Sequence, residues 1–167
     1  SKFLEEMSGY QLRWQVIDTW KTIESKSSMP VLFYDSAFLP THFSPLKLEH
    51  PDTGKGRDAL MEHMFHIAIE NSQHDNYFTE KLLDCLLTKT VPIYFGCPNI
   101  SEYFDTDGMF IIESCSDLHE VLSELTPQKY FDMMDSINKN YELAQQYKNF
   151  TERVRTEVQS MINEKEK

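Results

Sequence analysis

Short, continuous apolar runs recur along the chain, separated by segments whose apolar residues have helical spacing. Four such runs are predicted strands: 31–34 ("VLFY"), 65–70 ("FHIAIE"), 91–96 ("VPIYFG") and 108–113 ("GMFIIE"). They lack the alternation of polar and apolar residues that marks a sheet with one solvated face. Strands of this kind, alternating with helices, predict a parallel sheet covered on both faces, which is a doubly wound, Rossmann-like α/β fold.

Helical periodicity predicts the elements between these strands. Leu12, Val16 and Ile23 share one face of a helix that runs from about Tyr10 to Ser25. Prolines predict a loop over residues 39–56. The other predicted helices are a short one at 57–64, one from Thr79 to Thr88, a short one capped by Asn99, one that opens with Ser116 or Asp117 as its cap, and an almost continuously helical stretch from Pro127 to Lys167.

Length and charge limit the class of protein. At 167 residues the chain is most simply one domain, spanning 1–167. Sixteen Lys and Arg residues against 27 Asp and Glu residues give a net charge of −11. Such a surface repels nucleic acids and acidic membranes, so neither is expected as the main partner. Any anionic ligand must therefore be held by a local site that works against the overall charge.

Cysteine content and hydropathy bear on the compartment. Cys85, Cys97 and Cys115 form no CxxC pair and are odd in number, which favours reduced, buried thiols over a disulfide or a zinc site. No apolar run approaches the ~20 residues of a membrane span, and no signal peptide is recognisable. A cytosol-like compartment is expected for this fragment, with the Golgi lumen as the alternative if an N-terminal membrane anchor was removed.

One basic residue points to a ligand. Lys81 falls in the first turn of the predicted helix 79–88, where the backbone already presents partial positive charge, so a negative group is expected in front of it. Ligands of a doubly wound sheet bind beyond the carboxyl ends of the strands, which is where this helix begins. Thr79 or Asn76 can cap the helix, and a phosphate docked on its free N–H groups would also gain from the dipole. A nucleotide diphosphate fits the size and position of such a site.

The loop before this helix is not glycine-rich, so it is neither a P-loop nor a GxGxxG turn. It carries instead side chains that grip the hydroxyls of ribose or other sugars: Glu70, Asn71, Ser72, Tyr77 and Glu80. Such hydroxyl-binding groups are unusual beside a site that binds phosphate alone.

The segment "FHIAIENSQHDNYFTEKLLDCLLTKTVPIYFGCPNI" resembles the signature of the α-1,3/1,4-fucosyltransferase family. The match runs without a gap through Phe65, Glu70-Asn71-Ser72, Tyr77, Thr79-Glu80-Lys81, Pro92 and Gly96. Upstream, "LRWQVIDTWKTI" is similar to a helix of the same family and would make Arg13 its nucleotide-binding arginine.

The resemblance implies that this chain is one of the two domains of a GT-B enzyme. In such an enzyme, two Rossmann-like domains face each other across a cleft. This chain would be the C-terminal, GDP-fucose-binding domain, and its helices from about residue 127 would pack back on it or toward the partner domain. The acceptor-binding domain, which supplies the general base, is expected to be missing from a chain that starts directly before its first helix. Fucose would be transferred with inversion to a hydroxyl of a glycan acceptor, without a metal ion or another cofactor.

The resemblance also implies a role for each matched residue. Arg13 and Lys81 would stabilise the departing diphosphate and thereby replace a metal. Tyr77 would lie against the phosphates and Glu80 would hold ribose or sugar hydroxyls. The remaining donor-pocket residues would be Glu70, Asn71, Ser72 and Thr79.

Alternatives stay open for several of these residues and for the protein. Glu70 can cap backbone instead of binding hydroxyls, Glu80 can simply complement the helix dipole, and Lys81 can be solvated. His66 is expected to be a core histidine. At the level of function, the alternatives are a GT-B transferase with another nucleotide-sugar, a non-catalytic nucleotide-sugar-binding module and a structural α/β module.

Overall fold

The computed structural model describes residues 8–19, 22, 23, 25, 27, 29 and 63–165. Its elements are α2 (Ser8–Asp18), β1 (Phe65–Ile69), α4 (Glu80–Leu87), β2 (Val91–Phe95), the 3-10 turns η3 (Ile100–Glu102) and η4 (Thr106–Gly108), β3 (Phe110–Ile111), α5 (Cys115–Glu124), α6 (Pro127–Asp132), α7 (Met134–Gln145) and α8 (Phe150–Lys165). The strand predicted at 31–34 and the loop at 39–56 lie outside the described residues. So does most of the helix predicted at 57–64, of which only His63 and Met64 are described, as bends.

The three described strands form one parallel sheet in the order β1-β2-β3, as the apolar runs predicted. Phe65 pairs with Val91 and Ile69 with Phe95, so β1 and β2 are in register over their full lengths. Every residue of β2 is buried because this strand is central and both of its faces are covered. Pro92 is its second residue, near the strand start as expected. β3 has two residues and is shorter than the run 108–113 suggested.

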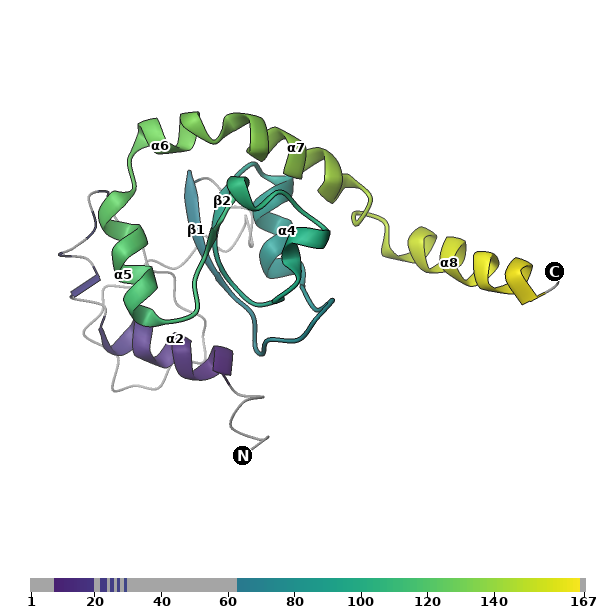
Figure 1. Ribbon diagram of the computed structural model, residues 1–167, viewed down its shortest axis with the longest axis horizontal. Coiled ribbons are helices and arrows are strands. Elements are labelled where there is room, and N and C mark those ends of the chain that lie inside the picture. The colour runs from purple at the N-terminus through teal and green to yellow at the C-terminus, as the bar shows by residue number, and fades with distance from the viewer. Residues whose placement is uncertain are drawn as a thin grey trace, which may run out of the picture.

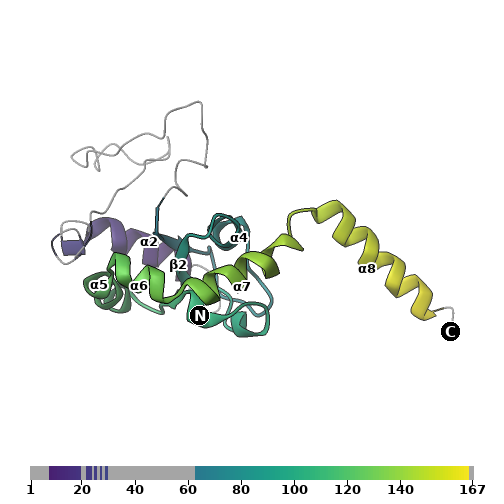
Figure 2. The ribbon, with the colours of Figure 1, turned by 90° about the horizontal axis from the view of Figure 1, so that it is seen from above.

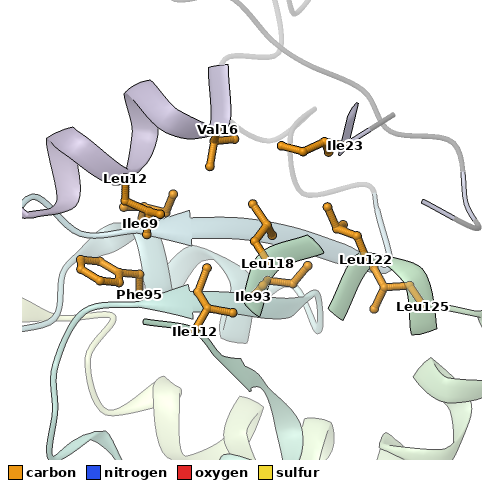
Figure 3. Close-up of a cluster of buried hydrophobic side chains, with 10 residues drawn as sticks. All are labelled: Leu12, Val16, Ile23, Ile69, Ile93, Phe95, Ile112, Leu118, Leu122 and Leu125. Carbon is orange, nitrogen blue, oxygen red and sulfur yellow. The ribbon is translucent and has the colours of Figure 1, made fainter. Parts of the chain in front are cut away.

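Helices cover both faces of the sheet (Figure 1). On one face, Leu12 and Val16 of α2 and Leu118 of α5 pack on Ile69 and Ile93 (Figure 3). The opposite face holds a second cluster that includes Leu82, Cys85 and Leu86 of α4, Ala68 of β1, Tyr94 of β2 and Ala144 of α7. Neighbouring strand residues thus point to opposite clusters, and each fully buried leucine or isoleucine contributes roughly 1.5–3 kcal/mol. The prediction of a sheet covered on both faces is confirmed for the described strands.

The helix starts differ in part from the sequence prediction. Thr79, and not Asn76, caps α4, and Pro127 is at the start of α6 as predicted. Asn99 occupies the N-cap position of η3, but its side chain makes no capping hydrogen bond. The helix at 115–124 is capped by Ser114, which corrects the prediction of Ser116 or Asp117. Asp117 closes a capping box by accepting the N–H of Ser114, so its role belongs to the third helical position.

The assignment of Ser114 as the cap can be tested by mutation, with the nearby Ser116 as a control. Ser114→Ala removes the hydroxyl that accepts the Asp117 N–H, and we expect it to lower the free energy of unfolding by about 1 kcal/mol. Ser116→Ala, at an exposed position two residues further on, should change it by less than about 0.5 kcal/mol. Urea denaturation followed by circular dichroism measures both variants. Equal effects would contradict the assignment of Ser114 as the cap.

The two ends of the described chain differ in how they pack. Regular helix in α2 ends at Asp18, although residues 22, 23 and 25 are also helical, within the range predicted up to Ser25. At the other end α7 packs against α4, whereas α8 leads away from the body of the molecule (Figures 1 and 2). Four apolar side chains of α8 are exposed: Val154, Val158, Met161 and Ile162. Among the described residues, no helix is both long enough and apolar enough to cross a bilayer.

His66 in β1 is half-buried, and burial, reinforced by neighbouring His63, lowers its pKa from the usual 6.5. In the unfolded chain His66 binds a proton below about pH 6.5, whereas the folded protein resists that proton until lower pH. We therefore expect stability to fall as the pH drops from about 7 to 5, and His66→Gln to flatten this dependence. Urea midpoints across that range test it, with His74→Gln on an exposed loop as the control. Parallel curves for His66→Gln and the unmodified chain would contradict the assignment.

Candidate functional site

The predicted site residues gather where β1 and β2 end and α4 begins. Glu70 directly follows β1, and its N–H donates to the Phe95 carbonyl at 2.8 Å, which extends the strand pairing by one residue. The start of α2 reaches the same edge, because the Gly9 N–H donates to the Asn71 carbonyl at 3.2 Å. A Cβ on Gly9 would lie 1.7 Å from the Glu70 carbonyl oxygen, so only glycine permits this approach. Helix, strand end and loop are thus held together at the carboxyl edge of the sheet.

Glu70 lies at this edge of the sheet, and its side chain is fully buried. Its carboxylate accepts the Thr79 N–H at 2.7 Å, and the Thr79 hydroxyl lies 2.8 Å from the other oxygen. Thr79 in turn caps α4, so the carboxylate fixes the residue that starts the helix. A buried carboxylate bonded to the Thr79 N–H fits the alternative that Glu70 caps backbone. Its contact with the donor stays a prediction.

Lys81 has negative partners within the chain. Its Nζ lies 3.6 Å from Glu70 Oε2 and 3.5 Å from Glu80 Oε1, and it donates to the Thr79 hydroxyl at 3.3 Å. Its side chain remains 31% exposed. The anion expected in front of this lysine is therefore supplied in part by two carboxylates, while about a third of the side chain remains open to solvent.

Arg13 extends from α2 to the end of β1. Its guanidinium donates to the Ile69 carbonyl and, at 2.9 Å, to Asn71 Oδ1, and it lies 5.2 Å from the centre of the Tyr10 ring. Burial lowers the pKa of Arg13, an effect partly offset by the field of Tyr10, Glu70 and Tyr77. The structure thus brings Arg13 and Asn71 together at the strand edge that also carries Glu70.

The remaining predicted residues line the loop that leads to α4. Ser72 and Tyr77 are half-buried, and the Tyr77 ring lies 6.3 Å from that of His74. Glu80 is exposed. Burial acts to raise the pKa of Glu80, but its own backbone N–H, the charge of Lys81 and the Thr79 hydroxyl outweigh it, so the pKa is lowered. Glu80 therefore stays ionised beside Lys81, as a dipole-complementing residue at a helix start would.

A polar link between two loops was missed from the sequence. The Asn76 N–H donates to Asn99 Oδ1 at 2.8 Å, and the Asn99 amide donates back to Asn76 Oδ1 at 2.9 Å. The Tyr103 hydroxyl donates to the same Asn76 oxygen at 2.5 Å, and the Cys97 thiol to Asn99 Oδ1 at 3.0 Å. Asn76 has a φ of 64°, a conformation that asparagine adopts more readily than most residues. The link fastens the loop after β1 to the turn after β2.

Gly96 allows the end of β2 to approach Glu70. A Cβ at this position would lie 2.3 Å from the Tyr94 hydroxyl and 2.7 Å from Glu70 Cγ. That hydroxyl accepts the Cys97 N–H at 3.0 Å, and burial raises the pKa of Tyr94 well above its usual value. Tyr94 is thus a neutral structural group beneath the site, and the three cysteines are unpaired.

Taken together, two cations and two carboxylates share the edge, so its formal charge is balanced before any ligand binds. A phosphate-bearing ligand would have to compete with Glu80 and Glu70 for Lys81, while Arg13 and the first N–H groups of α4 would add attraction. Within residues 63–165 and the described part of α2, no three His, Cys, Asp or Glu side chains are grouped as a metal would need.

Comparison with known proteins identifies the family. The model of the C-terminal region of glycosyltransferase family 10 (fucosyltransferase) matches residues 21–167. This chain therefore belongs to glycosyltransferase family 10. The matched range includes every predicted site residue except Arg13.

Similar curated proteins carry fucosyltransferase names. Alpha-(1,3)-fucosyltransferase FucT of Helicobacter pylori is 28% identical over 80 residues, which is 45% of this chain and 17% of that protein. GDP-fucose protein O-fucosyltransferase 3 of Gallus gallus is 29% identical over 107 residues, 62% of this chain and 22% of that protein. Alpha-(1,3)-fucosyltransferase B of Drosophila melanogaster is 46% identical over 44 residues, 26% and 10% of the two chains. The chain thus spans about a fifth or less of the length of these relatives. No solved structure matches it.

Proposed function

We propose that this chain is the donor-binding part of a fucosyltransferase that takes fucose from GDP-fucose and transfers it, with inversion, to a hydroxyl of a glycan or protein acceptor. The observation that carries the proposal is the family match over residues 21–167 together with Lys81 at the start of α4. Relatives named for GDP-fucose and for fucosyl transfer support the donor. The base that deprotonates the acceptor would come from a partner domain of the GT-B type.

In this proposal the chain's own residues bind and orient the donor. Lys81 and Arg13 stabilise the diphosphate as it leaves, in place of a metal ion. Tyr77, Asn71 and Ser72 line the donor pocket, and Glu80 holds hydroxyls of the ribose or the sugar. Thr79 caps α4, whose first N–H groups face the donor, and Glu70 holds Thr79 in place by accepting its N–H.

A second candidate is a nucleotide-sugar-binding module without catalysis. It remains a candidate because Glu70 and Glu80 partly neutralise Lys81 and so reduce the charge available to stabilise a departing diphosphate, whereas Arg13 and the first N–H groups of α4 can still bind the donor. A GT-B transferase that uses a different nucleotide-sugar would share the same cradle.

Calorimetric titration of the purified chain with GDP, GDP-fucose, GDP-mannose and UDP-sugars, without added metal, tests the proposal. We expect GDP and GDP-fucose to bind and UDP-sugars not to bind. Tighter binding of another nucleotide-sugar would replace the donor, and an absence of binding to every nucleotide would overturn the proposal for this chain.

A further inference from the structure

Phe78 anchors the loop that precedes α4. It stands between Tyr77 and the capping Thr79, and its ring lies 5.1 Å from Tyr103 and 5.5 Å from Phe104. These separations, with interplanar angles of 59° and 76°, are typical of favourable tilted and edge-to-face aromatic pairs. A shift of this ring would carry the adjacent Thr79 with it.

The third neighbour of Phe78 comes from the far end of the chain. Tyr147, just beyond α7, lies 5.3 Å from Phe78 and 5.7 Å from Phe104. Arg153, in the first turn of α8, places its guanidinium carbon 4.1 Å from the centre of the Tyr147 ring. The first turn of α8 and the start of α4 are therefore connected through two rings, Tyr147 and Phe78.

The guanidinium of Arg153 stacks on the face of the Tyr147 ring. Its Nη1 is buried and has no hydrogen-bond partner among the residues that the structure describes. A partly desolvated guanidinium above a tyrosine ring is attracted by the ring quadrupole, and this contact orients the Arg153 side chain. Beyond this first turn, α8 extends away from the sheet (Figure 2). The contact between Arg153 and Tyr147 joins the start of the helix to the body.

We propose that Tyr147 and Arg153 are positioning residues for the start of α4, which the proposed function assigns to the donor site. Arg153 fixes the Tyr147 ring; Tyr147 fixes Phe78; and Phe78 fixes Thr79, which caps α4 and precedes Glu80 and Lys81. This inference rests on the proposed function only for the identity of the ligand. A change in the position of the first turn of α8 is thereby transmitted to the start of α4.

Two measurements on the whole chain test the proposal. Amide hydrogen exchange at Thr79 and Lys81, without ligand, reports the order of the α4 start. Titration with GDP reports the site. The variants are Tyr147→Ala and Arg153→Ala, with Tyr147→Phe as a conservative variant that keeps the ring. Tyr130→Ala is the matched control, because Tyr130 packs on Phe65 at 6.0 Å and donates to the Lys89 carbonyl at the opposite edge of the sheet.

For Tyr147→Ala and Arg153→Ala we expect exchange at Thr79 and Lys81 to rise about tenfold and the GDP dissociation constant to rise about 3- to 10-fold. Tyr147→Phe should restore both values, and Tyr130→Ala should leave both unchanged even where it lowers the melting temperature. Unchanged exchange in the two variants, or an equal rise in Tyr130→Ala, overturns the positioning role. If the unmodified chain binds no nucleotide but the exchange at α4 still rises in the two variants, the proposed function fails while the positioning of α4 is supported.

Discussion

Lys81→Ala is expected to weaken GDP binding by about 10- to 100-fold, since a charge-assisted contact to phosphate contributes roughly 1.5–3 kcal/mol. The reason lies in the placement of the ammonium. The Lys81 side chain is 31% exposed, and its Nζ lies 3.3 Å from the hydroxyl of Thr79, which caps α4. The charge and the helix dipole therefore act on the same region. Isothermal titration with GDP measures the change directly.

The control for this prediction has to separate binding from folding, because Lys81 also faces Glu70 and Glu80. The pair with exposed Glu80 contributes about 0–1 kcal/mol, but Lys81→Ala also removes the cation beside the fully buried Glu70. The melting temperature of Lys81→Ala should therefore fall, and GDP binding is compared at a temperature where the variant is still folded. Lys129→Ala, which breaks an exposed pair with Glu124 at 3.7 Å elsewhere, should keep both affinity and melting temperature. Should Lys81→Ala bind GDP as tightly as the unmodified chain, the ammonium serves only its two carboxylates.

Much of the fold follows from local pattern. The continuous apolar runs at 65–69 and 91–95 predicted parallel strands because both of their faces are buried, and the structure pairs them in register. Thr79 could be found as a cap because a hydroxyl before an apolar-periodic segment satisfies backbone N–H groups. The capping box at Ser114 and Asp117 also had a local signal, the S-x-x-D spacing, which the sequence reasoning overlooked.

The site was less predictable because its geometry depends on contacts between distant residues. Asn76 and Tyr103 are 27 positions apart, and nothing local to either residue indicates that their side chains meet. Arg13 reaches Asn71 across 58 positions, most of them a segment whose path the pattern does not reveal. Lys81 shows the same limit in another way. Its sequence position calls for an anion, but only side-chain geometry shows that Glu70 and Glu80 supply part of it.

Glu70 is the residue whose two interpretations differ most in their consequences. If Glu70 holds the capping residue Thr79 in place, as their hydrogen bonds indicate, Glu70→Ala should lower the free energy of unfolding by about 3 kcal/mol. It removes a charged acceptor from two donors and leaves the Thr79 N–H without its partner. Part of this cost is offset because an ionised carboxylate no longer has to be buried. Glu70→Gln retains one carbonyl oxygen for the Thr79 N–H, so its loss of stability should be about half as large.

Chemical denaturation followed by the fluorescence of the two tryptophans, one of which is Trp14 in α2, and by circular dichroism measures these differences. Glu80→Ala is the matched control: it removes an exposed carboxylate ten positions away that pairs with the same Lys81, and it should change stability by less than about 1 kcal/mol. The opposite pattern would be equally informative. Undiminished stability in Glu70→Ala with complete loss of GDP-fucose binding would mean that the carboxylate turns outward to the donor. In that case Glu70 would exchange its hydrogen bonds to Thr79 for contacts with the donor, and Thr79 would need another partner.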